Sequence, residues 1–407
     1  MEVKEIDLNA EIEKLIREAQ NSTSYEALTF IAEQLLNLLM LKQRELFLKQ
    51  QKEQNPKNKA NGFYERELAC LFGLLNLNIP RDREALFRPS ILPDKWKKAD
   101  PKFNEFLLNL VFNSYSPNQI KSLLHKINLP YSPEEIDKLK NHLYQKALEL
   151  KNKDLPQNVF AIFIDAYHCQ IKDEKLQRVR NTTIYTVIGI DLDGNKNLFG
   201  YYCLWGHENK GDWLQIFNDL INRGLKRIMI IVSDDFPGLD EAIKTLFPQT
   251  DHQLCYVHLQ RNLFKNMARK DAQEFNKFLK SLKYCNNFEE ALEKFKEKCE
   301  KFIKKYPGYM KYLLEKGEKY LVFLRYPEGV RKHIYTTNIV ENFHSKLEVA
   351  RMRSGGYFQS VKTAEVSIYV VYENMRDRNW RKPLPGVRHC SYELKQMFHL
   401  KFQTQFS

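Results

Sequence analysis

Two apolar runs, each ending at an aspartate, constrain the fold of this chain more than any other feature. VFAIFI precedes Asp165, and RIMIIVS precedes Asp234 and Asp235. An uninterrupted apolar run predicts a strand that is buried on both faces, as in a sheet with helices on its two sides. We therefore expect two central strands that end at Asp165 and Asp234 and bring their carboxylates to one edge of the sheet, where the ligands of open α/β sheets gather.

The segments around these runs predict the rest of a mixed sheet. TIYTVIGIDLDGNKNLFGYYCLW indicates two strands joined by a turn at Asp193-Gly194. GDWLQIFNDLINRG indicates a helix that buries Trp213 and ends at Gly224, and a short helix in GLDEAIKTLF and a short strand in HQLCYV follow. This order of elements suits an α+β fold, a mixed sheet flanked by helices of the ribonuclease-H-like kind.

The remaining segments have helical patterns, and a chain of 407 residues is expected to form about two or three domains. Lys, Glu, Phe and Leu at helical spacing after residue 258 predict a helical block that interrupts the sheet-forming part of the chain. The expected regions are a helical N-terminal region at 1–55, a second helical region at 56–152, the sheet-containing core at 153–258 and 326–385, an all-helical insertion at 259–325 and a tail at 386–407.

The second helical region contains a pair of helices with a short break between them. Ser116 is a candidate cap for the first helix, and the segment SPEE, with Ser132 and Pro133, has the pattern of a helix start. Two helices joined by a short turn are compatible with a helix-turn-helix that binds DNA and equally with a plain helical hairpin.

The formal net charge of +13 favours a polyanionic partner, either nucleic acid or an anionic membrane surface. A membrane-spanning helix needs about 20 apolar residues, and the most apolar early stretch, Leu35 to Leu41, is short. The N-terminal residues lack the layout of a secretory signal. We therefore expect a cytoplasmic protein with no membrane partner.

The seven cysteines are scattered, and their odd number in a long chain predicts reduced thiols. Cys255 and His258 have the C-x2-H spacing of zinc ligands, with His252 nearby, but a structural zinc site takes four ligands. No second pair has suitable spacing, so we expect Cys255 and His258 to pack and hydrogen-bond where the core meets the helical insertion. Trp380, in RDRNWRK, has two equal interpretations, stacking on nucleic acid and packing.

Taken one at a time, the carboxylates have ordinary structural explanations. Asp165 and Asp234 are each suited to cap the turn or helix that follows a strand. Glu341 lies three residues after Asn338 in YTTNIVENFHSKL, the position of a capping-box glutamate. The local pattern alone therefore favours caps over metal ligands at each position.

Several blocks in a fixed order resemble the catalytic region of the Mutator-type transposases of bacterial insertion sequences. They are FIDAYH with Asp165, GIDLDGNKNLFGYY, SDDFPGLDEAI, FPQTDHQLCYVHLQRN and YTTNIVENFHSKL. The spacing from Asp234 to Gly238, the C-x2-H motif, and Glu341 after YTTN make the resemblance specific. It covers residues from about 155 to 380, and it extends more weakly to IPRDR at 79–83 and to the helical pair.

This resemblance implies a DNA transposase that cleaves the ends of an insertion element and joins them to target DNA. It assigns Asp165, Asp234 and Glu341 as the catalytic residues and as ligands of two Mg²⁺ or Mn²⁺ ions. The family usually has glycine after the second aspartate, so Asp235 is a departure, and whether it assists Asp234 stays open.

The same resemblance implies DNA as the partner, as terminal inverted repeats bound by the helical N-terminal regions and as target DNA. It also implies a dimer or larger assembly and no nucleotide cofactor. The alternatives are a nuclease or resolvase on the same core and a non-catalytic DNA-binding protein derived from a transposase.

Basic residues surround the expected site and are predicted to contact the DNA backbone. Arg261 follows the C-x2-H motif. The residues that flank Glu341 are Arg325, Arg331, Lys332, Lys346, Arg351 and Arg353. The alternative for this flanking set is a solvated helix face.

Overall fold

The computed structural model of the chain describes residues 24–52, 55–93, 117–126, 133–205, 209–285 and 287–403, with scattered positions at 13, 17 and within 100–110. The chain divides into two compact units, Met1–Lys140 and Asn141–Ser407. No helix in these described ranges is long and apolar enough to span a membrane.

The first unit contains a helix and a β-hairpin. They are α2 (Ser24–Gln51), β1 (Ala60–Cys70) and β2 (Gly73–Asp82). The prediction of a helical region at 56–152 is wrong for the hairpin. Side chains of β2 alternate between buried and exposed, which is the period of a strand with one face on a core, and Leu77 packs there with Met40 of α2. Gly73 turns the chain at a φ of 118°, which favours glycine.

The predicted helical pair is present as α4 (Pro117–Lys126) and α5 (Pro133–Lys151). Each helix buries apolar side chains, among them Ile120 of α4 and Leu143 of α5. The proposed cap Ser116 and the connection at 127–132 lie outside the described residues, so the helix-turn-helix interpretation stays a prediction.

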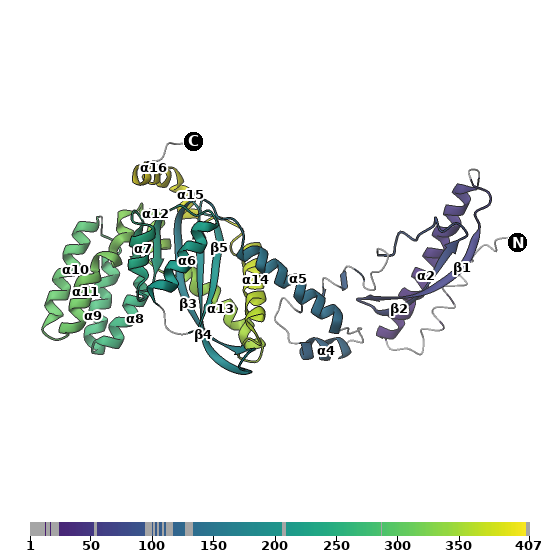
Figure 1. Ribbon diagram of the computed structural model, residues 1–407, viewed down its shortest axis with the longest axis horizontal. Coiled ribbons are helices and arrows are strands. Elements are labelled where there is room, and N and C mark those ends of the chain that lie inside the picture. The colour runs from purple at the N-terminus through teal and green to yellow at the C-terminus, as the bar shows by residue number, and fades with distance from the viewer. Residues whose placement is uncertain are drawn as a thin grey trace. The chain divides into compact units, whose positions relative to one another are not determined.

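The second unit is built on a five-stranded mixed sheet of order β5-β4-β3-β6-β7 (Figure 1). Its strands are β3 (Asn158–Asp173), β4 (Arg178–Ile190), β5 (Lys196–Leu204), β6 (Arg227–Ser233) and β7 (Asp251–Leu254). β3, β4 and β5 pair in antiparallel fashion, whereas β3, β6 and β7 are parallel. The predicted mixed sheet is therefore confirmed.

Helices cover both faces of this sheet (Figure 1). Those that carry or support the site are α6 (Lys210–Asn222), α7 (Leu239–Leu246), α13 (Asn338–Arg353) and α14 (Val361–Asp377). α6 and α7 pack on one face, where Trp213 is buried in the core as predicted. α13 and α14 pack on the other face, where Phe343 and Leu347 of α13 join the larger apolar cluster.

A group of helices follows β7 and lies beside the sheet (Figure 1). They are α8 (Tyr256–Asn266), α9 (Arg269–Leu282), α10 (Phe288–Ile303) and α11 (Pro307–Leu321), with a 3₁₀ turn η1 (Val322–Arg325) and α12 (Glu328–Ile334) after them. Gly317 of α11 lies against Phe295 of α10, where a Cβ would come within 2.8 Å of the ring. A glycine therefore lets these two helices pack closely.

The C-terminal residues differ from the expected tail at 386–407. They form α15 (Pro385–His389) and α16 (Ser391–Phe402). Leu394 and Phe398 of α16 are buried in the larger apolar cluster, so this segment packs on the second unit.

Candidate active site

The register of the parallel strands brings two of the predicted carboxylates together. β3 and β6 pair up to Ile164 and Ser233, so Asp165 and Asp234 are the next residues on adjacent strands. The expectation that the first strand ends at Asp165 is wrong, because β3 continues to Asp173 while paired with β4. Asp165 therefore projects from the middle of the long strand β3, directly after the last residue of β3 that pairs with β6.

Glu341 comes to the same place from the first turn of α13. The capping-box explanation is wrong here, because α13 begins after Thr337 without a side-chain cap and Glu341 Oε1 accepts a hydrogen bond from Arg261 Nη1 at 2.7 Å. Neither Asp234 nor Asp235 caps α7, which begins after Gly238 without a side-chain cap.

All three carboxylates line one open cleft of about 540 Å³. The cleft receives side chains from β3, from the loop after β6, and from α8 and α13. Its lining comprises Asp165, Ala166, Tyr167, His168, Asp234, Phe236, His258, Arg261, Glu341, His344, Ser345 and Glu348. The structure thus brings together residues that are far apart in the chain.

Asp165 is the most buried of the three, with 6% of its surface exposed. Burial, reinforced by the negative charge of Asp234, raises the pKa of Asp165 to about 7, although the N–H of Ala166 donates to its carboxylate at 2.8 Å. His344 Nδ1 lies 3.7 Å from Asp165 Oδ2. Burial lowers the pKa of His344 to about 3, so this imidazole is neutral and brings no charge to offset the carboxylate.

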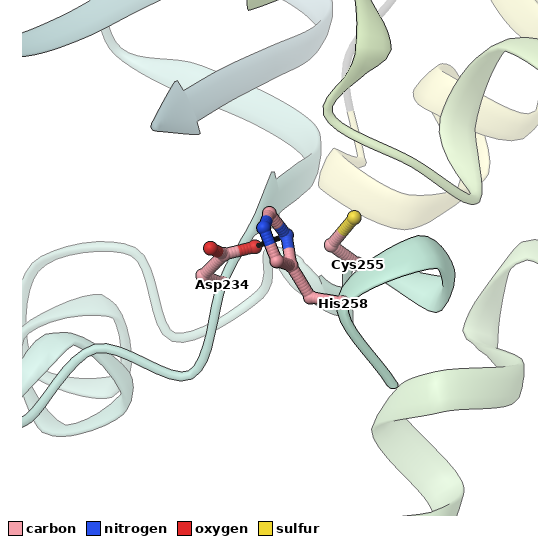
Figure 2. A group of neighbouring side chains, drawn as sticks. All are labelled: Asp234, Cys255 and His258. Atoms are coloured by element: carbon pink, nitrogen blue, oxygen red, sulfur yellow. Dashed lines mark ion pairs between the residues drawn. The ribbon is translucent and has the colours of Figure 1, made fainter. Parts of the chain in front are cut away.

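His258 of α8 forms an ion pair with Asp234 through Nδ1 (Figure 2). Burial disfavours the charged imidazole, but hydrogen bonds with Asp234 and Cys255 outweigh it and raise the pKa of His258 to about 10. His258 Nε2 lies 3.9 Å from Glu341 Oε1. His258 and Arg261, one turn apart on α8, therefore place positive charge beside two of the three carboxylates.

Asp235 points away from the cleft toward the helical insertion. Its Oδ1 accepts a hydrogen bond from Lys316 Nζ at 2.9 Å, and its Oδ2 accepts one from the Tyr312 hydroxyl at 2.9 Å. Both partners belong to α11. Asp235 thus ties the loop that carries Asp234 to the last helix of the insertion.

A second network, of hydrogen bonds and ion pairs, holds the carboxyl end of β6 at Ser233. His252 of β7 lies between Ser233 and Asp240, with Nε2 2.9 Å from Ser233 Oγ and Nδ1 3.2 Å from Asp240 Oδ1. Asp240 also forms ion pairs with Lys244 of α7 and Lys319 of α11. Ser233 is fully buried, so this serine, histidine and aspartate set cannot reach a substrate and holds the strand end in place.

Among the basic residues predicted to bind DNA, some are held by partners within the protein and others are exposed to solvent. Arg331 donates to the backbone carbonyls of Tyr326, Cys285 and Leu324, so three of its five N–H donors serve packing. Arg351 pairs with Glu348 at the rim of the cleft. The exposed members are Arg261, Arg325, Lys332, Lys346 and Arg353.

Two further residues have partners within the second unit. Arg325 pairs with Glu318 at 2.7 Å and lies 4.0 Å from the centroid of the Phe288 ring. Trp380 is buried and stacks on Phe343 with ring centroids 6.2 Å apart, which confirms the packing interpretation of this tryptophan.

Sequence reasoning missed the partnership of His258 with Asp234 and the place of His344 beside Asp165. His344 lies three residues after Glu341 on the same helix, a spacing that puts two side chains on one face and is visible in the sequence. The approach of His258 to Asp234 depends on how β6 and β7 pair, which no local pattern reveals.

The chain matches the model of the family described as "Transposase, Mutator family" over residues 2–383. It belongs to this family. The match includes all three carboxylates of the cleft and ends before α15. The chain is similar to curated transposases of insertion sequences from several bacteria.

The transposase for insertion sequence element ISRM3 of Rhizobium meliloti is 31% identical over 360 residues, which cover 87% of this chain and 86% of the relative. The transposase for IS905 of Lactococcus lactis is 24% identical over 84% of this chain and 86% of the relative. The transposase for IS256 in transposon Tn4001 of Staphylococcus aureus is 25% identical over 60% of this chain and 63% of the relative.

Proposed function

We propose that this protein is a DNA transposase that cleaves the ends of an insertion element and transfers them to target DNA. Asp165, Asp234 and Glu341 are its catalytic carboxylates. The observation that carries the proposal is their convergence from three separate elements into one open cleft, in a chain of a transposase family.

The topology supports a ribonuclease-H-like core. In the second unit three antiparallel strands come first, and the two later strands, each preceded by a helix, are added in parallel on the other side of β3. A helical insertion then separates the second aspartate from the helix that carries Glu341. This is the arrangement that the resemblance implies.

The donor set fits divalent metal ions of the magnesium class. Mg²⁺ takes oxygen ligands, and Asp165, Asp234 and Glu341 supply carboxylate oxygens. The mutual repulsion that helps to raise the pKa of Asp165 is what a cation between the carboxylates would relieve. Two such ions, when bound, would activate the attacking hydroxyl and stabilise the leaving oxygen.

Asp234 is the better candidate for the second ligand than Asp235. Asp234 lines the cleft, whereas both carboxylate oxygens of Asp235 are held by Lys316 and Tyr312. The role of Asp235 in this proposal is to position the loop, and the ligand is Asp234 alone.

The surroundings of the cleft support a DNA substrate. Arg261 lines the cleft, and a neighbouring hollow of about 730 Å³ shares His168 with it and includes Arg351. This hollow follows the β3–β4 ribbon away from the three carboxylates and offers a path for a DNA strand. Arg261, Arg351 and the exposed Lys332, Lys346 and Arg353 supply positive charge that would bind the phosphates of DNA. Binding of the terminal repeats by the α4–α5 region and action as a dimer or larger assembly belong to the same proposal.

The test uses DNA carrying the element's terminal repeat, cut in advance so that a free 3′-hydroxyl is present. With Mg²⁺ or Mn²⁺ the protein is expected to join this end to a target plasmid. Release of hydrolysis products with no joined product would favour the alternative, a nuclease or resolvase on the same core. A protein that binds the DNA but neither cuts nor joins it would be a non-catalytic derivative.

A further inference from the structure

The strand register that unites the catalytic aspartates also brings a cysteine to the site. β6 and β7 pair in parallel up to Ser233 and Leu254, and the N–H of Cys255 donates to Ser233 O at 2.8 Å. Asp234 and Cys255 therefore leave the sheet side by side. α8 begins immediately afterwards, so His258 lies about one turn beyond Cys255 on the same side of the helix.

The result is a compact group of three different ligand atoms (Figure 2). One carboxylate oxygen of Asp234, the sulfur of Cys255 and a ring nitrogen of His258 all lie within 4.8 Å of one another. Cys255 is buried, and the Thr337 hydroxyl lies 3.4 Å from its sulfur. Glu341 Oε1 lies 3.9 Å from the other nitrogen of His258.

This ligand set has the chemistry of a zinc-class ion and not of magnesium. Mg²⁺ prefers oxygen ligands only, whereas thiolate and imidazole favour Zn²⁺ and its neighbours. Three protein ligands with a fourth position open are typical of zinc sites that exchange a water or substrate. Thr337 and Glu341 stand where outer partners orient a ligating sulfur and imidazole.

We propose that Asp234, Cys255 and His258 form a binding site for one Zn²⁺ ion and that its occupancy inhibits the protein. Inhibition is expected because a zinc ion held by Cys255 and His258 would draw the Asp234 carboxylate away from the catalytic magnesium ions. Binding of zinc stands on the three side chains alone, and only the inhibitory consequence rests on the proposed transposase function.

Cobalt(II) is the probe for binding, because a thiolate bound to Co²⁺ gives a charge-transfer absorption band in the near ultraviolet. Titration of the whole protein with CoCl₂, without DNA or Mg²⁺, is expected to produce this band with one equivalent, and Zn²⁺ is expected to remove it. Because neither DNA nor cleavage is involved, a failure here leaves the proposed transposase chemistry untouched. Conversely, a protein that joins no DNA can still give the band.

Matched variants locate the ion. Cys255→Ser and His258→Gln are each expected to abolish the band, while Cys285→Ser, at a half-buried thiol outside the site, keeps it. Asp234→Asn is expected to weaken Co²⁺ binding at least about tenfold, and Asp235→Asn, which removes no ligand and only loosens the loop that carries Asp234, is expected to weaken it clearly less.

The Thr337 hydroxyl, which lies beside the Cys255 sulfur, allows a test of the site that removes no ligand. Thr337→Val keeps the shape of a buried side chain and removes its hydroxyl, and the affinity for Co²⁺ is expected to fall about tenfold. Circular dichroism of each variant establishes that it is folded, and His258→Gln serves where Cys255→Ser does not fold.

The inhibitory part is tested by cleavage in Mg²⁺ with increasing Zn²⁺, each variant compared with its own rate without zinc. We expect inhibition of the unmodified protein to weaken as Mg²⁺ is raised and Cys255→Ser to resist zinc. A cobalt band that survives both Cys255→Ser and His258→Gln, or no band at all, would overturn the site. Equal zinc sensitivity in Cys255→Ser would overturn the inhibition.

Discussion

Gly238, in the loop that follows Asp234, is packed against the backbone of Lys210, and its replacement by alanine tests how far this packing positions Asp234. It precedes α7 in the left-handed region, at a φ of 77°, four residues after Asp234. A Cβ at this position would lie 2.6 Å from the backbone nitrogen of Lys210 and 2.7 Å from its Cα. Because these are backbone atoms, no side-chain rotation relieves the contact. Gly238→Ala is therefore expected to push the loop away from α6 and displace Asp234.

The magnitude has two parts. The left-handed conformation costs an alanine about 1 kcal/mol, and forcing a methyl group into packed backbone adds about 2 kcal/mol. We expect Gly238→Ala to lower the free energy of unfolding by about 3 kcal/mol in total. Gly355→Ala is the matched control, because Gly355 also has a positive φ, of 94°, but no atom lies within 4 Å of its Cβ position. Its expected loss is about 1 kcal/mol.

Thermal unfolding followed by calorimetry measures the effect of each variant. Both glycines lie in the second unit, so their decreases in Tm can be compared directly. The expected decrease in Tm is about 6–12 °C for Gly238→Ala and about 2–4 °C for Gly355→Ala. Gly238→Ala should also need more Mg²⁺ for half-maximal cleavage, because Asp234 is displaced. Equal decreases in Tm for the two variants would refute the steric part of the reasoning.

Three other outcomes are expected. Metal-dependent strand transfer should fall at least about 100-fold in each of Asp165→Asn, Asp234→Asn and Glu341→Gln, but less than about tenfold in Asp235→Asn. Gel assays with pre-cut ends measure the rate of strand transfer. An equal loss for Asp235→Asn would mean that Asp235 is a metal ligand. Lys316→Met should raise the Mg²⁺ concentration needed for half-maximal activity, and Lys316→Arg should restore it, because the ion pair with Asp235 positions the loop; unchanged Mg²⁺ dependence would remove that role. The pKa of Asp165, raised by burial and by Asp234 from 3.8 to about 7, predicts that the metal-free protein loses stability as pH rises from about 4 to about 7. Calorimetry across this range should show the loss in the unmodified protein and a smaller one in Asp165→Asn.

The main outline of the second unit was predictable because its strands are buried on both faces. Such strands appear in the sequence as uninterrupted apolar runs. Asp234 follows its strand as predicted, whereas Asp165 lies within β3, which continues to Asp173. The hairpin of the first unit was missed because its apolar residues are divided between a buried face and an exposed one. Leu71 and Leu74 are exposed, and they make the segment look like one apolar helical stretch.

The capping explanations failed for a physical reason as well. Spacing alone permits a capping box at Asn338 and Glu341, but Arg261, from a helix that follows a different strand, offers Glu341 a charged donor. Charge-assisted hydrogen bonds are stronger than those to a neutral backbone N–H. Likewise, nothing near Arg331 in the sequence indicates that its guanidinium would be taken up by three backbone carbonyls.

The sequence by itself determined which residues have the chemistry to bind metal and that Asp165 and Asp234 follow buried apolar runs, because burial and residue chemistry are local properties. Tertiary structure alone decided which of them meet. The parallel register of β3, β6 and β7 sets Asp165, Asp234 and Cys255 side by side. The packing of α11 on the loop turns Asp235 away, so the choice between two adjacent aspartates, identical in chemistry, depends on contacts with residues some 80 positions further along the chain.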